Sequence, residues 1–241
     1  HSIECSFYCL YTFICTFKSR LFYCGKLSID KLIYERMYRG IDMERLQKQF
    51  DFILEIDKEK SIERQTYISD GSRKENDAEH AWHMALMCFL LSEHANESID
   101  KLKTIMMLLI HDLVEIYAGD TFAYSNADID EVHAKELKAA DKLYSKLPKD
   151  QATYLKNLWI EFEEGKTAEA RFAHTIDNIQ PMMLNFATKG KAWTEHRVKI
   201  SQVLKRNKNT SKGSDILWKY ACQYFLRPSI KRERLINDIE L

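Results

Sequence analysis

Hydrophobic and polar positions follow a helical period over most of the chain. The central stretch 105–110 is apolar throughout and ends directly in the pair His111-Asp112. A run without Gly, Pro or charge predicts a helix that is buried on all sides. We expect this central helix over residues 99–117, because Gly119 and Asp120 then break the pattern.

Similar apolar repeats predict helices on both sides of the central one. Asn76 and Glu79 have the spacing of a capping box, which places a helix start there and His80 in its first turn. The preceding segment, 62–76, contains a turn signal and is expected to be an irregular loop. Pro181 is expected to kink or interrupt the helix that contains it. The other predicted helices cover residues 43–60, 76–91, 129–147, 149–164, 167–183, 191–205 and 214–225.

These elements predict an all-α fold, a single helical bundle around one core, and the 7 Gly and 3 Pro residues argue against an all-β chain. Residues 1–42 differ in character. Their aromatic run 7–17 is shorter than the roughly 20 apolar residues that span a bilayer. Charge follows this run instead of preceding it, unlike a signal peptide. We therefore expect the domain at 43–241, with 1–42 as an atypical N-terminal extension.

Charge and cysteine usage narrow the functional classes. Lys+Arg and Asp+Glu balance at 36 each, so no overall field points to nucleic acid or to a membrane. The basic C-terminal section, which includes Lys205 and Arg206, is interpreted as solvated surface. The six cysteines form no close pair and indicate neither a zinc ribbon nor a disulfide framework. A reducing, cytoplasmic location is favoured.

Four residues have the chemistry of metal ligands: His80, His111, Asp112 and Asp177. Imidazole nitrogens and carboxylate oxygens without thiolate suit one divalent ion such as Mn²⁺, Co²⁺, Fe²⁺, Ni²⁺ or Zn²⁺. Ionisable groups beside a core are costly unless they are paired or bind a metal. The alternative is a helix that simply reaches solvent at His111.

Two further carboxylates extend this set. Glu115 lies one helical turn after His111, where it could orient an attacking water, and Asp120 could reach a leaving group. His174 is interpreted as a packing residue or a partner of Asp177. The remaining candidates are interpreted as structural histidines or a solvated loop residue: His83, His94, His133, His196 and Arg73.

The pattern of these residues resembles the HD-domain superfamily of metal-dependent phosphohydrolases. More narrowly, Arg64, the runs 75–80 and 111–115, and Asp120 resemble the branch that contains bacterial 5′-deoxynucleotidases and related eukaryotic HD proteins. The similarity extends over residues 43–186. Characterised deoxynucleotidases of this branch have Trp where this chain has Gln65, so the choice between deoxyribose and ribose stays open.

The resemblance implies a role for each matched residue. It implies one divalent ion on the four ligands, Glu115 to position or activate the attacking water, and Asp120 to assist near the ester oxygen. Arg64 would hold the substrate phosphate, for which the fork geometry of a guanidinium is suited. A homodimer is implied by the family alone.

The leading hypothesis is a metal-dependent phosphomonoesterase that hydrolyses a small nucleoside 5′-monophosphate, with no nucleic-acid or membrane partner. One alternative is an HD hydrolase of another phosphate ester: a cyclic dinucleotide, an alarmone or a nucleoside triphosphate. The other is a non-catalytic metal- or nucleotide-binding sensor. Glu115 and Asp120 beside the four ligands favour an enzyme, because a pure binder would not need both.

Overall fold

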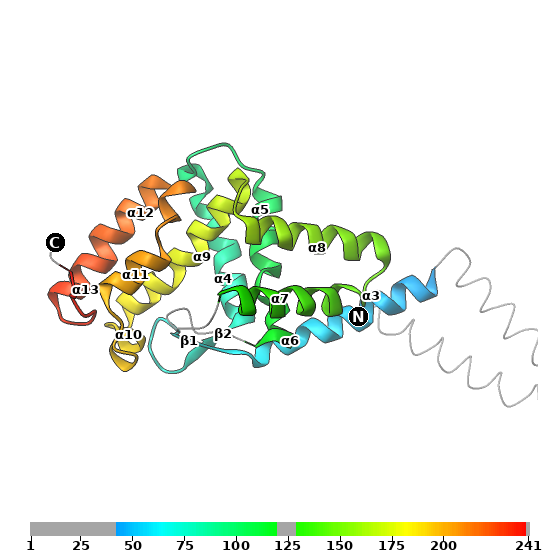
Figure 1. The fold of residues 1–241 in the computed structure, drawn as a ribbon, viewed down its shortest axis with the longest axis horizontal. Coiled ribbons are helices and arrows are strands. Elements are labelled where there is room, and N and C mark those ends of the chain that lie inside the picture. The colour runs from blue at the N-terminus through cyan, green and yellow to red at the C-terminus, as the bar shows by residue number, and fades with distance from the viewer. Residues whose placement is uncertain (1–41, 120–128, 240–241) are drawn as a thin grey trace, which may run out of the picture. The chain divides into compact units, whose positions relative to one another are not determined.

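The computed structural model describes residues 42–119 and 129–239. Within them the fold is all-α, as predicted, apart from one two-stranded antiparallel sheet (Figure 1). No helix in these two ranges is both long and apolar enough to cross a bilayer. The predicted extension, 1–42, lies outside the described residues except for Asp42, and its separate status stays a prediction.

The first half of the domain contains the hairpin and the helices around it. Its elements are α3 (Met43–Ile56), the 3₁₀ turn η1 (Asp57–Ser61), β1 (Glu63–Tyr67), β2 (Lys74–Asn76), α4 (Asp77–Leu91), η2 (Ser92–His94), α5 (Lys101–Ile110), η3 (Asp112–Val114) and α6 (Glu115–Ala118).

The second half is helical throughout its described length. It comprises α7 (Ile129–Tyr144), α8 (Lys149–Glu164), α9 (Ala168–Ala187), α10 (Lys191–Glu195), α11 (Ile200–Arg206), the 3₁₀ turn η4 (Thr210–Lys212), α12 (Asp215–Ala221), the π-helical turn η5 (Cys222–Leu226) and α13 (Arg227–Lys231).

Helix α5 lies at the centre of the bundle and packs against α4, α8 and α9. Met107 and Leu108 on α5 meet Met84 of α4 and Ile176 of α9 in the core, all of them fully buried. Burial on all sides was nevertheless a wrong prediction, because Leu109 is 37% exposed. The three neighbouring helices leave that side of α5 uncovered.

The predicted continuous helix over 99–117 is also wrong, since α5 ends at Ile110 and a 3₁₀ turn separates it from α6. Side chains from other helices donate hydrogen bonds to backbone carbonyls at this break. Tyr144 donates its hydroxyl to the Ile110 carbonyl at 3.4 Å, and the Trp159 indole N–H donates to the His111 carbonyl at 3.2 Å. The helical ladder can therefore end inside the core without leaving these groups unsatisfied.

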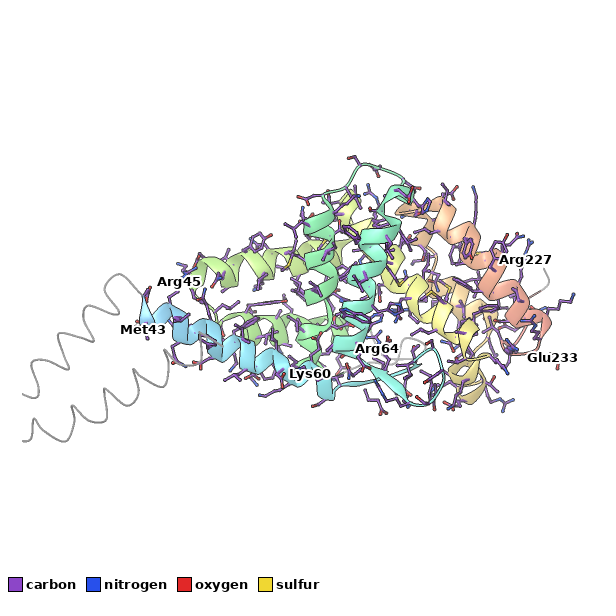
Figure 2. The ribbon with its side chains drawn as sticks, turned by 180° about the vertical axis from the view of Figure 1, so that it is seen from behind. Met43, Arg45, Lys60, Arg64, Arg227 and Glu233 are labelled. Atoms are coloured by element: carbon purple, nitrogen blue, oxygen red, sulfur yellow. The ribbon has the colours of Figure 1, made fainter. Side chains whose placement is uncertain are left out.

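The segment 62–76 is a β-hairpin and not the irregular loop expected from sequence. Glu63 pairs with Asn76 and Tyr67 with Lys74. The predicted turn is confirmed at its tip, where Gly71 adopts a left-handed φ of 72°. Figure 2 shows Arg64 on β1, just beyond the end of η1 at Lys60 and Ser61. The hairpin thereby places Arg64 beside the start of α4, where it contacts Asp77.

Pro181 neither stops nor divides α9, which runs from Ala168 to Ala187. Proline lacks the N–H that would bond the carbonyl four residues earlier, which here belongs to Asp177. Most residues of α9 around this position are buried. Packing therefore maintains the helix across the missing bond.

The predicted helix 191–205 is two helices, α10 and α11, because the chain between them pairs elsewhere. Ile236 donates its N–H to the Val198 carbonyl at 3.0 Å, and the Ile200 N–H donates to the Ile236 carbonyl at 2.9 Å. Arg197 adopts a left-handed φ of 50° just before this pairing. Likewise, the predicted first helix ends at Ile56. The helix predicted over 214–225 consists of α12 and the π-helical turn η5, and α13 continues the chain beyond it.

Candidate metal centre

His80 lies in the first turn of α4, where a complete capping box holds the helix start. The Glu79 N–H donates to the Asn76 side chain at 2.9 Å, and the Asn76 N–H donates back to Glu79 at 3.2 Å. The His80 side chain is fully buried, and its Nε2 lies 3.2 Å from Asp177 Oδ1. The capping box fixes the helix start that carries His80, whereas the packing of α9 brings Asp177, 97 positions away, to its imidazole.

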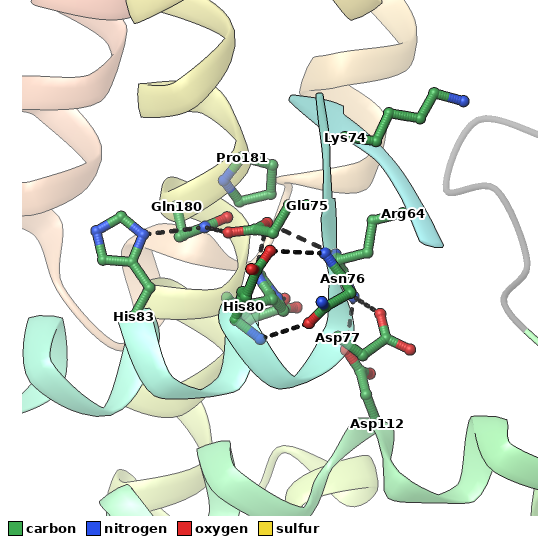
Figure 3. Close-up of polar contacts among 12 residues, drawn as sticks. Arg64, Lys74, Glu75, Asn76, Asp77, His80, His83, Asp112, Gln180 and Pro181 are labelled. Carbon is green, nitrogen blue, oxygen red and sulfur yellow. Dashed lines mark hydrogen bonds and ion pairs between the residues drawn. The ribbon is translucent and has the colours of Figure 1, made fainter. Parts of the chain in front are cut away.

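Glu75 supports His80 from the other side of the imidazole. Its Oε2 lies 3.5 Å from His80 Nδ1, and its Oε1 accepts from Gln180 Nε2 at 2.7 Å (Figure 3). The Gln180 amide also lies 3.2 Å from His83 Nδ1, which gives His83 the structural role predicted for it. The carboxylate lies beside Nδ1 of His80 without a hydrogen bond to it, and Nε2 faces Asp177. A carboxylate beside the outer nitrogen is common at metal-binding histidines.

His111 and Asp112 occupy the break after α5. His111 Nε2 lies 3.0 Å from Asp112 Oδ2 and 3.9 Å from Asp177 Oδ1. Its Nδ1 donates to the Leu108 carbonyl at 3.0 Å. The edge of the Phe162 ring packs against the His111 imidazole at a centroid distance of 5.0 Å, so the ring is held in orientation.

The structure therefore brings the four predicted ligands together from α4, the end of α5, η3 and α9. Ligand atoms of His80, His111 and Asp112 lie within 4.8 Å of one another, and Asp177 lies against both imidazoles. In both histidines Nδ1 faces a group outside the cluster, Glu75 or the Leu108 carbonyl, and Nε2 faces into it. This set of two imidazoles and two carboxylates fits one first-row divalent cation.

Charge within the cluster is strongly coupled. Burial alone would raise the pKa of Asp112 and Asp177, but the imidazoles and nearby arginines outweigh it and lower both pKa values. Burial opposes charge on His111 as well, yet Asp112 and Asp177 raise the pKa of that imidazole to about 9. The carboxylates are thus held ionised, the form in which they bind a cation.

Arg64 is anchored to this cluster as well as lining a cavity. Its Nη1 donates to Asp112 Oδ2 at 2.7 Å and to Asp77 Oδ1 at 2.9 Å. Sequence reasoning assigned no role to Asp77, which is fully buried. Burial and the charge of Asp112 raise the pKa of Asp77 to about 6, although Arg64 and a hydrogen bond with Glu115 oppose the rise. In the sequence, the signal that could have identified Asp77 was its position in the run 75–80, on which the family resemblance rests.

Two cavities meet at the cluster. One measures about 130 Å³ and the other about 1050 Å³, and the walls of both include Asp112, Glu115 and Asp177. Glu115 opens α6 and faces the space next to the ligands, as its spacing from His111 predicted. Asp120 lies outside the described residues.

Arg206, at the end of α11, lines both cavities. Its Nη2 lies 3.8 Å from Asp177 Oδ2, so a guanidinium stands at the cluster on the side of α9. Arg206 is solvent-exposed, as predicted, with 41% of its side chain accessible, but it also lines the cavities beside the cluster. The basic pair at 205–206 was visible in the sequence, but only the fold shows that Arg206 lies beside Asp177.

The remaining candidates have local partners. His174 stacks on Phe162 at a centroid distance of 4.2 Å and donates Nε2–H to the Phe162 carbonyl at 2.7 Å, which agrees with a packing role. Arg73 pairs with Glu79 on the exposed side of the hairpin. His133 lies with Glu136 and Glu163, with ligand atoms within 4.8 Å of one another.

The described residues of the site lie within a range of the chain that matches one known protein family. The family model of the HD domain matches residues 56–218. A crystal structure from Magnetospirillum magnetotacticum MS-1, named as a predicted metal-dependent phosphohydrolase, is 44% identical with a TM-score of 0.77. That comparison covers 82% of this chain and 98% of the bacterial one.

Curated relatives match over a shorter region. The 5′-deoxynucleotidase HDDC2 of Xenopus laevis is 31% identical over 111 residues, 46% of this chain and 54% of the relative. The 5′-deoxynucleotidase hdd1 of Schizosaccharomyces pombe is 29% identical over 126 residues, 50% of this chain and 62% of the relative. The chain thus spans about half the length of the first curated relatives that it matches.

Proposed function

The chain belongs to the HD-domain family, and from this membership we propose that it is a metal-dependent phosphohydrolase acting on a small nucleoside 5′-monophosphate. The observation that carries the proposal is the convergence of His80, His111, Asp112 and Asp177 beside a cavity lined by Glu115 and Arg206. The names of the curated relatives support a nucleotide as substrate.

In this proposal the four ligands hold one divalent cation, with Mn²⁺, Co²⁺, Fe²⁺, Ni²⁺ and Zn²⁺ all compatible with the donor set. When bound, such a cation polarises a phosphoryl oxygen and neutralises charge that develops there. The protein's part is to keep the two carboxylates ionised and all four donors aimed at one point. Glu75 and the Leu108 carbonyl do so by fixing the two imidazoles.

Two guanidinium groups flank the place where the substrate phosphate would lie. Arg206 stands on the α9 side, next to Asp177, and Arg64 on the hairpin side, next to Asp112. Guanidinium donors aimed at phosphate oxygens stabilise charge in the transition state without reorganising. We therefore assign phosphate binding to Arg64, as predicted from sequence, and to Arg206 with it.

Glu115 is assigned to the attacking water. Its carboxylate lines both cavities beside the ligands, so it can accept a proton from a water held next to the phosphate. Asp120, outside the described residues, keeps its predicted role near the departing ester oxygen.

The test is release of inorganic phosphate from a panel of nucleoside mono-, di- and triphosphates and cyclic dinucleotides. Protein stripped with EDTA is reloaded with Mn²⁺ or Co²⁺ and assayed beside Asp112→Ala and the exposed control Asp51→Ala. We expect release from monophosphates by the wild type and the control, and loss of both metal and activity in Asp112→Ala. Equal activity of Asp112→Ala would overturn the proposal.

One observation favours a second substrate class. The larger cavity, about 1050 Å³, has room for more than a mononucleotide. A cyclic dinucleotide, an alarmone or a nucleoside triphosphate would then be hydrolysed fastest in the same panel. A sensor would instead gain thermal stability with nucleotide and release no phosphate. The homodimer and the cytoplasmic location stay predictions.

A further inference from the structure

The side chain of Gln180 is fully buried on α9 and links this helix to β2 and α4. Its Nε2 atom lies 2.7 Å from Glu75 Oε1 and 3.2 Å from His83 Nδ1 (Figure 3). Gln180 follows the ligand Asp177 by three positions, so the two side chains lie on one face of α9. The amide is therefore placed one helical turn from a metal ligand.

The two contacts fix the orientation of the Gln180 amide. An ionised carboxylate can only accept, so the amide atom that faces Glu75 is the NH₂ group, which donates one hydrogen to it. The second hydrogen is left for His83 Nδ1, which then accepts and carries no hydrogen itself. Burial agrees with this assignment, because it lowers the pKa of His83 and favours the neutral imidazole. Both amide hydrogens are thus used.

The carbonyl end of the same amide has no comparable role. Gln180 Oε1 is buried and has no hydrogen-bond partner within the described ranges 42–119 and 129–239. A buried acceptor without a partner costs stability, and an apolar side chain of the same shape would avoid that cost. Packing alone therefore does not explain an amide here, whereas the contact of its NH₂ group with Glu75 does.

Glu75 extends this contact to the metal cluster. While its Oε1 is held by Gln180, its Oε2 faces two nitrogens, His80 Nδ1 at 3.5 Å and Arg64 Nε at 4.0 Å. These three atoms are all buried, and none has a hydrogen-bond partner among the residues that the structure describes. Rotation of the carboxylate decides how closely Oε2 approaches the two nitrogens, and the hydrogen bond from Gln180 restricts that rotation.

The imidazole of His80 consequently lies between the effects of two residues of one helix. Asp177 is 3.2 Å from its Nε2, and Gln180 acts on the side of Nδ1 through Glu75. A histidine that binds a cation through Nε2 needs its ring hydrogen on Nδ1. A carboxylate beside Nδ1 stabilises that tautomer and makes Nε2 a stronger ligand.

We infer that Gln180 is a positioning residue of the metal centre, which aims the Glu75 carboxylate at His80 and thereby raises the affinity for the divalent cation. The inference rests on the metal centre of the proposed function. It goes beyond that function by assigning control of cation affinity to a residue that is not a ligand. Outer partners of this kind change metal affinity by about 10–100-fold.

The experiment measures the affinity for Co²⁺ without any nucleotide. The full chain is stripped with EDTA, freed of the chelator and titrated with Co²⁺ while the visible absorption of the bound ion is followed. Gln180→Met removes both amide hydrogens from a side chain of similar length and should raise the Kd for Co²⁺ about 10–100-fold. The control is Asn185→Leu, since this buried amide lies on the same helix but donates to the Pro181 carbonyl. The control should lower the melting temperature and leave the Kd unchanged.

A second variant separates the aiming of Glu75 from a general effect on stability. The exchange Glu75→Gln with Gln180→Glu keeps a hydrogen bond between an amide and a carboxylate, but moves the carboxylate from the His80 side to the His83 side. We expect the exchange to melt at a higher temperature than Gln180→Met, while its Kd for Co²⁺ stays raised. The exchange also provides the test if Gln180→Met does not fold.

The outcomes separate this inference from the proposed function. Wild-type affinity in Gln180→Met would overturn it, as would an exchanged pair that binds Co²⁺ as tightly as the wild type. An equal rise of the Kd in Asn185→Leu would overturn it too, because the effect would then follow stability alone. These results leave the four ligands in place. Failure of the wild type to bind Co²⁺ or Mn²⁺ would instead overturn the metal centre itself.

Discussion

Glu59, on η1, provides a test of the site's electrostatics that needs no substrate. Its side chain is buried, with 7% of the residue exposed, and its Oε1 has no hydrogen-bond partner among the described residues. Burial, reinforced by the charges of Asp112 and Asp77, raises the pKa of Glu59 from 4.5 to about 7. The folded protein therefore binds this proton more tightly than the unfolded chain does.

The sign of the effect follows from linkage. Between pH 4.5 and about 7 the folded state holds a proton that the unfolded state has released, so stability falls as pH rises through this range. Above pH 7 the loss is complete. Glu59→Gln removes the ionisation and should stabilise the protein by about 1 kcal/mol at pH 5 and about 3 kcal/mol at pH 8, as upper estimates.

The assay is urea unfolding in EDTA at these two pH values, with the exposed substitution Glu93→Gln as control. EDTA is needed because a bound cation would hold the Glu59 carboxylate ionised and reduce the difference. We expect the gain from Glu59→Gln to grow between pH 5 and pH 8, while Glu93→Gln changes stability by little at either. A gain that is the same at both pH values, or a loss that deepens with pH, would refute the reasoning.

Three further predictions concern catalysis and local structure. Glu115→Gln should retain metal, measured by elemental analysis, and lower kcat by about 10²–10⁴-fold, so unchanged turnover would remove its assigned role. Arg206→Met should lower kcat/KM for phosphate release at least about tenfold, because one charge-assisted contact is lost, whereas Lys205→Met on the same helix should not. Asn76→Ala should lower the free energy of unfolding by about 1 kcal/mol in urea titrations, since it removes the cap of α4, and an unchanged midpoint would contradict the capping assignment.

Sequence alone predicted those features that neighbouring residues decide. The start of α4 was predicted because Asn76 and Glu79 are three positions apart and cap each other's backbone. The end of α8 was predicted because Gly165 adopts the left-handed conformation that closes a helix. The amphipathic repeats gave the all-α class for the same local reason, with 3.6 residues per turn.

Tertiary structure decided which distant side chains meet. Asp177 faces His80 across 97 residues, and no local rule specifies that distance, because it depends on how α9 packs against α4 and α5. The break after Ile110 also depends on distant donors, Tyr144 and Trp159, that take up carbonyls from outside the helix. The hydrophobic pattern of α5 cannot predict these two donors.

Arg206, Asp77 and Gln65 show the same division at the site. In the sequence, Arg206 was visible as part of a basic pair, Asp77 as a position in a motif, and Gln65 as an amide after an arginine. The direction of each side chain is nevertheless set by partners elsewhere in the chain. Arg206 meets Asp177, Asp77 meets Arg64, and His196 holds Gln65. A sequence specifies local conformation through contacts between residues a few positions apart. The geometry of a site depends instead on how distant helices pack against one another.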